Sequence, residues 1–126
     1  MIQIQSLLNI SDNSGGKLGR CIKILHGFKN RWSSYGELVL VSVQTFRKGK
    51  KLRFKAQKGE IVQAIILRTK AKHRRKNFHF IKFHENSVGL LNKQLRPIGT
   101  RVLGPVLHEL RKSKFMKIAS ISQGFI

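Results

Sequence analysis

The chain has 126 residues, which suffices for one domain with a buried core and leaves little room for a second. Its 26 Lys and Arg outnumber five Asp and Glu, giving a formal net charge of +21 at pH 7. Because such an excess repels itself in a compact protein, we expect the chain to work against a polyanion, most simply nucleic acid. Hydrophobic residues make up 40% of the chain, too many for a disordered basic tail.

The scarcity of acidic and thiol groups argues against catalysis and against a metal site. The five carboxylates are scattered and offer no acid–base pair, and no Ser or Cys nucleophile has a recognisable base partner. Cys21 is the single cysteine, and the five histidines show no ligand pair of the kind that zinc requires. We therefore expect no enzymatic activity, cofactor or metal, and we expect Cys21 to be a small buried residue in a strand.

Short β-like runs separated by turn-forming residues fill the first ninety residues. Val41 and Ile65 lie in the middle of the two most apolar runs, so we expect both to be fully buried. Alternation in the second run predicts that Leu18, Ile22 and Ile24 share one face. The number and spacing of the runs predict a mainly β fold, either a sandwich or a small closed barrel. The expected strands are Leu7–Ile10, Lys17–Leu25, Glu37–Gln44, Ile61–Thr69, Phe78–His84 and Ser87–Leu91.

Helix is expected only near the C-terminus, so that residues 1–95 form the β part of a single domain and 96–126 a loop with short helices. Pro105 is expected at the first helical position, where its missing N–H costs nothing. The predicted buried helix face consists of Val106, Leu107 and Leu110. The basic residues expected near the helix end, where positive charge suits the helix dipole, are Arg111, Lys112 and Lys114.

Half of the basic residues, 13 of 26, cluster around the strand expected at Ile61–Thr69. Most fall in two connections, Phe46–Lys58 and Lys70–Asn77, which leave opposite ends of that strand, and only Glu60 opposes them. An extended positive surface of this kind can grip a folded RNA at more than one place. The alternative is a pair of loops made basic for solubility, although Asp and Glu would serve that purpose better. The candidate RNA-binding residues are Arg47, Lys48, Lys50, Lys51, Arg53, Lys55, Lys58, Arg68, Lys70, Lys72, Arg74, Arg75, Lys76, Arg96, Arg111, Lys112 and Lys114.

Three aromatic residues stand beside cations in the loop before the third expected strand. Phe28, Trp32 and Tyr35 surround Lys29 and Arg31. An aromatic ring flanked by cations can stack on an unpaired RNA base. The alternative is that Trp32 or Tyr35 closes the end of the barrel, and the sequence leaves these two possibilities open.

The segment Arg96–Ile118 combines a Gly-Pro loop, a short predicted helix and a basic tail in that order. This segment resembles the C-terminal signature of the universal large-subunit ribosomal protein family numbered fourteen, an rRNA-binding β-barrel. Further matches cover nearly the whole chain: Met1-Ile2-Gln3, Leu8-Asn9, Asp12-Asn13-Ser14-Gly15, Cys21-Ile22-Lys23, Gly59-Glu60-Ile61, Ala64-Ile65-Ile66-Leu67-Arg68-Thr69-Lys70, Phe83-His84-Glu85-Asn86 and Leu90-Leu91-Asn92.

The resemblance implies a small closed five-stranded β-barrel that acts as a structural constituent of the large ribosomal subunit. Three positions depart from the family pattern. Phe78 stands where the hairpin turn generally has Gly, Gly89 stands where Val is usual, and the stretch Thr45–Lys58 is longer and more basic than is typical. These departures concern the hairpin geometry and the first basic loop.

The resemblance also implies partners: large-subunit rRNA, neighbouring large-subunit ribosomal proteins, and small-subunit rRNA at an intersubunit contact. The family offers a docking surface to a silencing factor that blocks subunit joining. Carried over by position, that surface involves Thr100, Arg101 and Lys117. Gly99 and Gly104 bracket the first two of these residues, so we expect the loop to turn outward.

A second interpretation is a free single-stranded nucleic-acid-binding barrel, which depends on a sheet face studded with aromatic residues. The expected strands carry mainly Val, Ile and Leu, which favours the ribosomal interpretation. Lys, Ile and Phe are abundant, as an AT-rich genome would give, and the N-terminal residues predict neither a signal nor a transit peptide. We expect an organelle-encoded mitochondrial ribosomal protein, with a bacterial or plastid protein as the alternatives.

Overall fold

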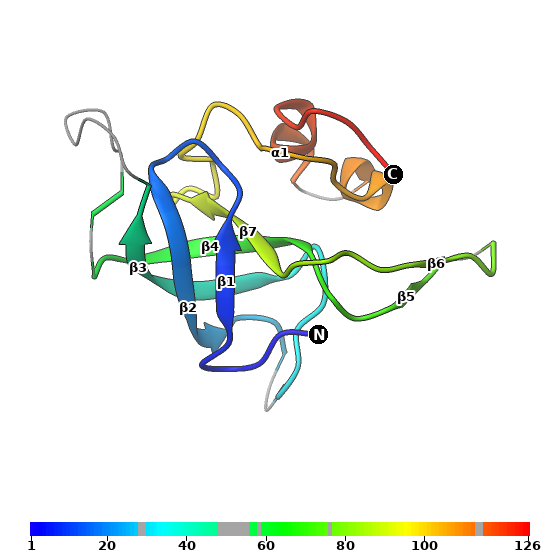
Figure 1. Cartoon of the computed structure of the whole chain (residues 1–126), viewed down its shortest axis with the longest axis horizontal. Helices are drawn as coiled ribbons and strands as arrows, with labels where there is room; N and C mark the ends of the chain where they lie inside the picture. Colours follow the sequence, from blue (N-terminus) through cyan, green and yellow to red (C-terminus); the bar gives the residue numbers. More distant parts are fainter. Residues whose placement is uncertain (28–29, 48–55, 58, 76, 113–114) are drawn as a thin grey trace.

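A computed structural model describes residues 1–126 except 28–29, 48–55, 58, 76 and 113–114. Five strands close into a barrel in the order β1-β2-β3-β4-β7 (Figure 1). Neighbouring strands are antiparallel except at β1 and β7, which pair in parallel and close the barrel. The predicted closed five-stranded barrel is therefore confirmed. Its strands are β1 (Leu7–Ile10), β2 (Gly16–Ile24), β3 (Leu38–Phe46), β4 (Ile61–Arg68) and β7 (Ser87–Leu91).

The remaining strands form an arm that projects from the barrel (Figure 1). β5 (His73–Arg74) pairs with β6 (Phe80–Ile81) in a two-stranded antiparallel hairpin. The strand predicted over Phe78–His84 is thus shorter than expected, because Phe78 lies in the hairpin turn with a φ of 60°. In that turn the Arg75 N–H donates to the carbonyl of His79 over 2.8 Å.

The barrel interior is filled by side chains that alternate along the strands. In β3, Val39, Val41 and Val43 are fully buried, as the period of two requires. β2 is irregular. Cys21 pairs with Val41 and Lys23 pairs with Leu40, so two steps along β2 correspond to a single step along β3. This bulge leaves Ile22 exposed while Ile24 is buried, so the prediction that the two residues share one face is wrong.

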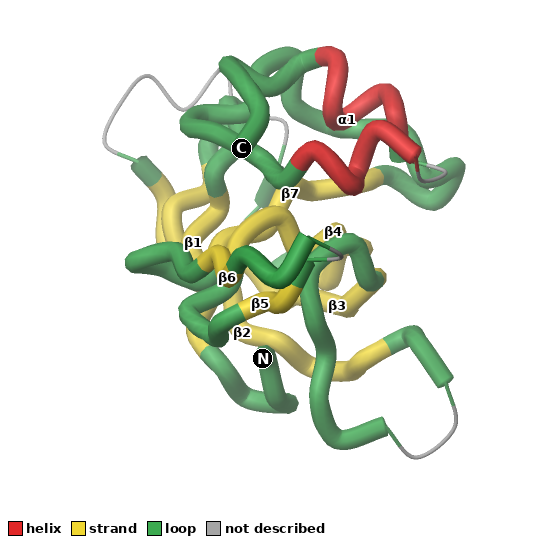
Figure 2. Tube along the Cα trace, turned by 90° about the vertical axis from the view of Figure 1, so that its right-hand side faces the viewer, coloured by secondary structure: helices red, strands yellow, loops and turns green. Residues whose placement is uncertain are grey.

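β4 is buried on both faces because a second core lies outside the barrel. Ile65 and Leu67 point away from the interior and pack against Val106, Leu110 and other residues of the C-terminal segment. Figure 2 shows this segment lying across the barrel on the side of β4 and β7. The expected burial of Val41 and Ile65 is confirmed, although the two side chains belong to different cores.

The C-terminal segment contains two short helices, η2 (His108–Lys112, a 3-10 helix) and α1 (Met116–Ser120). The prediction that Pro105 begins a helix is wrong. The next residue, Val106, pairs with Phe125 in a bridge and donates its N–H to the carbonyl of Gly124 over 3.0 Å. This pairing keeps the chain extended until His108. The predicted apolar side chains are nevertheless buried, namely Val106, Leu107 and Leu110.

Cys21 lies fully buried in β2, as predicted, and burial raises the pKa of its thiol above the ordinary value. A raised pKa keeps the thiol protonated and unreactive at neutral pH. Across the described residues, no helix is both long and apolar enough to cross a membrane.

Two isoleucines on the outer face of β4 allow a direct test of the outer core. Ile65→Ala removes a fully buried side chain and should lower the free energy of unfolding by about 2–5 kcal/mol. Ile61→Ala makes the same chemical change on the same strand, where the side chain is 62% exposed, and should change it by less than about 0.5 kcal/mol. Urea unfolding of both variants measures the difference, and equal losses would contradict this assignment.

Candidate nucleic-acid interface

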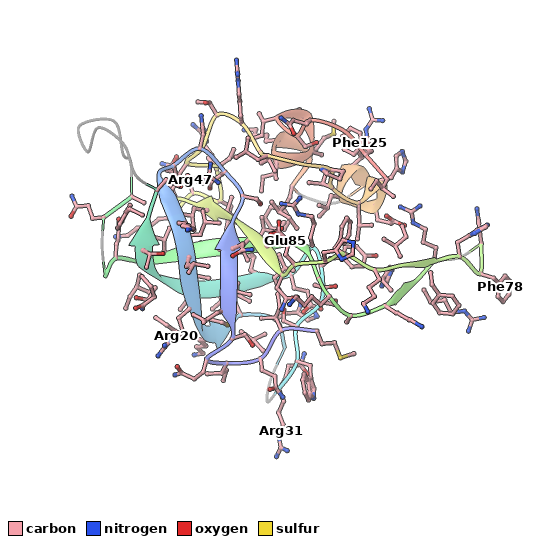
Figure 3. All side chains as sticks on the ribbon, in the orientation of Figure 1. Arg20, Arg31, Arg47, Phe78, Glu85 and Phe125 are labelled. Atoms are coloured by element: carbon pink, nitrogen blue, oxygen red, sulfur yellow. The ribbon has the colours of Figure 1, made fainter. Side chains whose placement is uncertain are left out.

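A cleft of about 620 Å³ opens between one end of the barrel and the C-terminal segment. Three cations, Lys17, Arg47 and Arg68, line it together with a single acid, Glu85. A concave surface with an excess of positive charge concentrates anions such as phosphate. The other lining residues are Asn9, Ile10, Ser11, Leu103 and Gly104. Arg47 and Glu85 are labelled in Figure 3.

Arg68 and Glu85 neutralise each other within this cleft. An Arg68 Nη2 to Glu85 Oε1 distance of 3.0 Å makes an ion pair, and the Arg68 side chain is only 11% exposed. Arg68 also donates to the Ser87 hydroxyl over 2.7 Å and to the Leu103 carbonyl over 3.1 Å. Burial lowers the pKa of Arg68, and Glu85 opposes that shift. Arg68 therefore holds β4, β7 and the C-terminal loop together, and the free charge of the cleft comes from Lys17 and Arg47.

Arg47 is fixed where the first basic connection leaves β3. Its Nη2 donates to the carbonyl of Ile10 over 3.1 Å, and its backbone N–H donates to the carbonyl of Gly15 over 3.0 Å. This bond uses one donor of the guanidinium, and within the described part of the chain the other donors have no partner. The other candidates on this connection lie outside the described residues: Lys48, Lys50, Lys51, Arg53, Lys55 and Lys58.

Further cations are exposed along β2, which begins beside the cleft, and they were absent from the sequence-based candidates. Lys17, Arg20 and Lys23 are all exposed on this strand, and Figure 3 shows Arg20 on the outside of the barrel. Their spacing of three does not fit a regular strand, in which residues three apart face opposite sides. The irregular pairing of β2 with β3 brings them to the surface, so the sequence alone carried no signal for this row.

The second basic connection divides into exposed and paired cations. Lys70, Lys72 and Arg74 are exposed at the base and along the arm. Arg75 is partly buried, with its Nε 2.8 Å from Glu109 Oε1, and it also donates to the C-terminal carbonyl oxygen of Ile126. Arg75 thus ties the arm to the C-terminal segment. Lys76 lies outside the described residues.

The basic candidates from Arg96 onward do not form one cluster with the cleft. Arg96 is exposed in a turn in which Asn92 caps the backbone, accepting the Arg96 N–H over 2.9 Å. Arg111 is exposed in η2, and its guanidinium lies 4.9 Å from the centre of the Phe125 ring. Lys112 is the last residue of η2, and Lys114 lies outside the described residues.

The candidate docking residues lie around the contact between a loop and α1. Asn13 holds the loop, because its side chain donates to the Thr100 hydroxyl over 2.7 Å and accepts the Thr100 N–H over 2.7 Å. The Val102 N–H then donates to the carbonyl of Ile121 at the end of α1, over 3.0 Å. Thr100, Arg101 and the α1 residue Lys117 are all exposed. The loop turns outward as expected, beside the helix that carries Lys117.

The aromatic loop residues take different roles. Tyr35 packs against the barrel core and makes an edge contact with His73 at 4.3 Å between ring centres, so it closes the barrel end. Burial raises the pKa of its hydroxyl, and nearby Glu109 adds to that rise. Trp32 is 52% exposed beside Arg31 and keeps the ability to stack on a base. Phe28 lies outside the described residues. Within the described ranges, no three His, Cys, Asp or Glu side chains are grouped so that they could hold a metal ion.

Arg68 and Lys70 provide a test that separates paired from free cations. Arg68→Ala removes a buried guanidinium with three partners and should lower the free energy of unfolding by about 1–3 kcal/mol. Lys70→Ala removes an exposed cation nearby and should change it by less than about 0.5 kcal/mol. Thermal and urea unfolding measure both values. If Arg68→Ala were as stable as Lys70→Ala, Arg68 would be free to bind a ligand.

A closed five-stranded barrel followed by a C-terminal segment with short helices matches what the sequence resemblance implied. The family model of ribosomal protein L14p/L23e matches residues 1–126, the whole length of this chain. Members of that family are large-subunit ribosomal proteins, which act as structural components of the ribosome and not as enzymes. This chain belongs to the ribosomal protein L14p/L23e family.

Proposed function

We propose that this chain binds large-subunit rRNA through the cleft beside Lys17 and Arg47 and through the exposed cations of the arm. The observation that carries the proposal is the charge of the cleft. Its one acid, Glu85, is already paired with Arg68 and accepts a bond from the Asn9 side chain over 2.6 Å. Two cations therefore remain without an opposing charge among the residues that line the cleft.

Binding of this kind depends on the phosphate backbone more than on the base sequence. Each phosphate neutralised by Lys or Arg releases counterions, so the affinity falls as salt rises. Folded RNA is recognised mainly by shape, and Arg47 of the cleft lies far from Phe78 at the end of the arm (Figure 3). Two separated contacts favour a folded RNA over a single extended strand.

The rival function of a free single-strand-binding barrel has less support. It needs aromatic residues along an exposed sheet face. In the five barrel strands the only aromatic residue is Phe46, which is partly buried and packs against the core. We therefore retain the ribosomal function, including a contact with small-subunit rRNA and with neighbouring large-subunit proteins. The high net charge and the abundance of Lys, Ile and Phe favour a mitochondrial ribosome over a bacterial or plastid one.

The salt dependence of RNA binding tests the cleft. The double variant Lys17→Ala/Arg47→Ala should reduce the slope of log affinity against log salt by about 1.4–1.8, at about 0.7–0.9 per lost phosphate contact. The probe is a fragment of large-subunit rRNA, titrated by filter binding. The matched control Lys17→Arg/Arg47→Lys keeps both charges and should keep the slope. An unchanged slope in the alanine variant would show that the cleft does not bind phosphate.

We also propose that Thr100, Arg101 and Lys117 form a surface for docking of a ribosomal silencing factor. Their exposure and the contact between their loop and α1 support this proposal. Thr100 is held by its side chain and backbone to Asn13, so the loop presents a fixed surface. The two cations on it complement an acidic protein partner.

Charge reversal separates docking from rRNA binding. Arg101→Glu/Lys117→Glu should leave incorporation into large subunits nearly intact while weakening capture of a silencing factor by at least tenfold, because attraction becomes repulsion. Sedimentation of assembled subunits and pull-down with the factor measure the two effects. A variant that fails to assemble while its isolated fold remains stable would show that these residues bind RNA.

A further inference from the structure

We propose that the tip of the β5–β6 arm is a stacking site for an unpaired RNA base, with the Phe78 ring as its platform. This inference rests on the proposed function, since it needs an RNA partner, but it concerns a contact with a base and not with phosphate. Figure 3 shows Phe78 at the far end of the arm, away from the barrel.

The first observation is the exposure of the ring. Phe78 is 73% exposed, more than any other large hydrophobic side chain that the structure describes. It lies in the turn between Arg75 and His79, and its backbone N–H donates to the carbonyl of Arg75 over 3.1 Å. Covering an aromatic ring that is exposed to water at the end of a projecting hairpin is favourable in free energy.

The second observation is the cation beside the ring. The Arg74 guanidinium carbon lies 4.8 Å from the centre of the Phe78 ring, a cation–π contact. This contact supports the ring from one side, and the exposure of Phe78 shows that much of the ring remains accessible. A base on the accessible face would complete a stack of base, ring and guanidinium, with positive charge close to the phosphate of the same nucleotide.

The third observation is that the base of the arm is held in place. His73 contacts the Tyr35 ring at 4.3 Å, and Arg75 joins Glu109 at 2.8 Å. Where the arm joins the barrel, the Phe83 N–H donates to the carbonyl of Thr69 over 3.2 Å. These contacts come from three different parts of the chain. A platform on an anchored arm loses less freedom on binding than one on an unsupported loop.

The fourth observation is a backbone conformation that Phe rarely adopts. The φ of Phe78 is 60°, in the left-handed region that glycine occupies without strain. A bulky residue at such a position is disfavoured for folding, and residues of this kind cluster at binding sites. Phe78→Gly is therefore a useful variant, because it removes the ring and glycine adopts this φ without strain.

Charge favours RNA over a protein as the occupant. Lys72, Arg74 and Lys82 are exposed along the arm. The sequence from Thr69 to His84 contains no Asp or Glu. A nucleotide supplies both partners that the tip offers, a flat base for the ring and a phosphate for the cations. An apolar protein surface would satisfy only the ring.

The test uses the full chain and a 12-nucleotide single-stranded oligoadenylate that carries one 2-aminopurine. Phe78→Gly and Phe78→Leu should weaken binding by roughly 5- to 150-fold and lose the stacking-dependent quenching of the 2-aminopurine fluorescence. Phe78→Trp should bind as well as the unaltered chain or better. None of these variants should change the salt slope, because no phosphate contact is removed. Ile61→Ala, which removes a comparably exposed apolar side chain from the opposite end of β4, should change neither reading.

The outcomes separate this inference from the proposed function. Salt-dependent binding that is equal in the unaltered chain and in Phe78→Gly would overturn stacking and leave phosphate binding in place. Full affinity in Phe78→Leu would show that an apolar side chain suffices without an aromatic ring, and would also overturn the inference. Absence of oligoadenylate binding by the unaltered chain would overturn the stacking inference alone, because the proposed function is tested separately with the rRNA fragment. A melting temperature for Phe78→Gly equal to or above that of the unaltered chain confirms that the variant folds.

Discussion

The turn at Asp12 and Asn13 is the interaction on which the arrangement of barrel and C-terminal segment depends. The Asp12 side chain is buried, and its carboxylate accepts the N–H of Ser14 over 3.0 Å and that of Leu90 in β7 over 2.8 Å. Asn13 makes the corresponding contacts with Thr100 on the opposite side. Bonds from backbone N–H groups to a carboxylate are strong, and losing the carboxylate would leave those donors buried without partners. One short turn therefore joins the end of β1, the closing strand β7 and the loop that presents the docking surface.

The cations of this chain fall into two groups, those that are partly buried and paired within the protein and those that are exposed. Arg68 and Arg75 direct their guanidinium groups toward carboxylates and carbonyls of the protein itself, and they hold the C-terminal segment and the arm in place. Lys17, Arg20 and Lys72 are exposed and keep their charge available to an external anion. A ribosomal protein with a charge of +21 needs both kinds. The paired cations stabilise the folded arrangement, and the exposed cations are available to bind an anion.

The C-terminal segment serves the barrel and the arm together. It covers the outer face of β4, where Ile65 and Leu67 would otherwise face water. Through Glu109 it also reaches Arg75 at the base of the arm, close to the Tyr35 ring that closes the barrel end. The cleft, the docking surface and the arm tip are thus set in position by one contiguous packing arrangement.

The apolar runs of the sequence determined the barrel strands, because β1 and β7 have the predicted bounds and β3 and β4 differ from them by at most two residues. The same runs determined the burial of Val41, Ile65 and Cys21. Tertiary structure alone decided three other features. The bulge in β2 turned Ile22 outward, pairing of Val106 with Phe125 delayed the helix to His108, and contacts with Glu85 and Glu109 made Arg68 and Arg75 structural. Periodicity within a strand is a local property that sequence displays. Strand register, bridges and ion pairs join residues distant in the chain, so they exist only once the chain has folded.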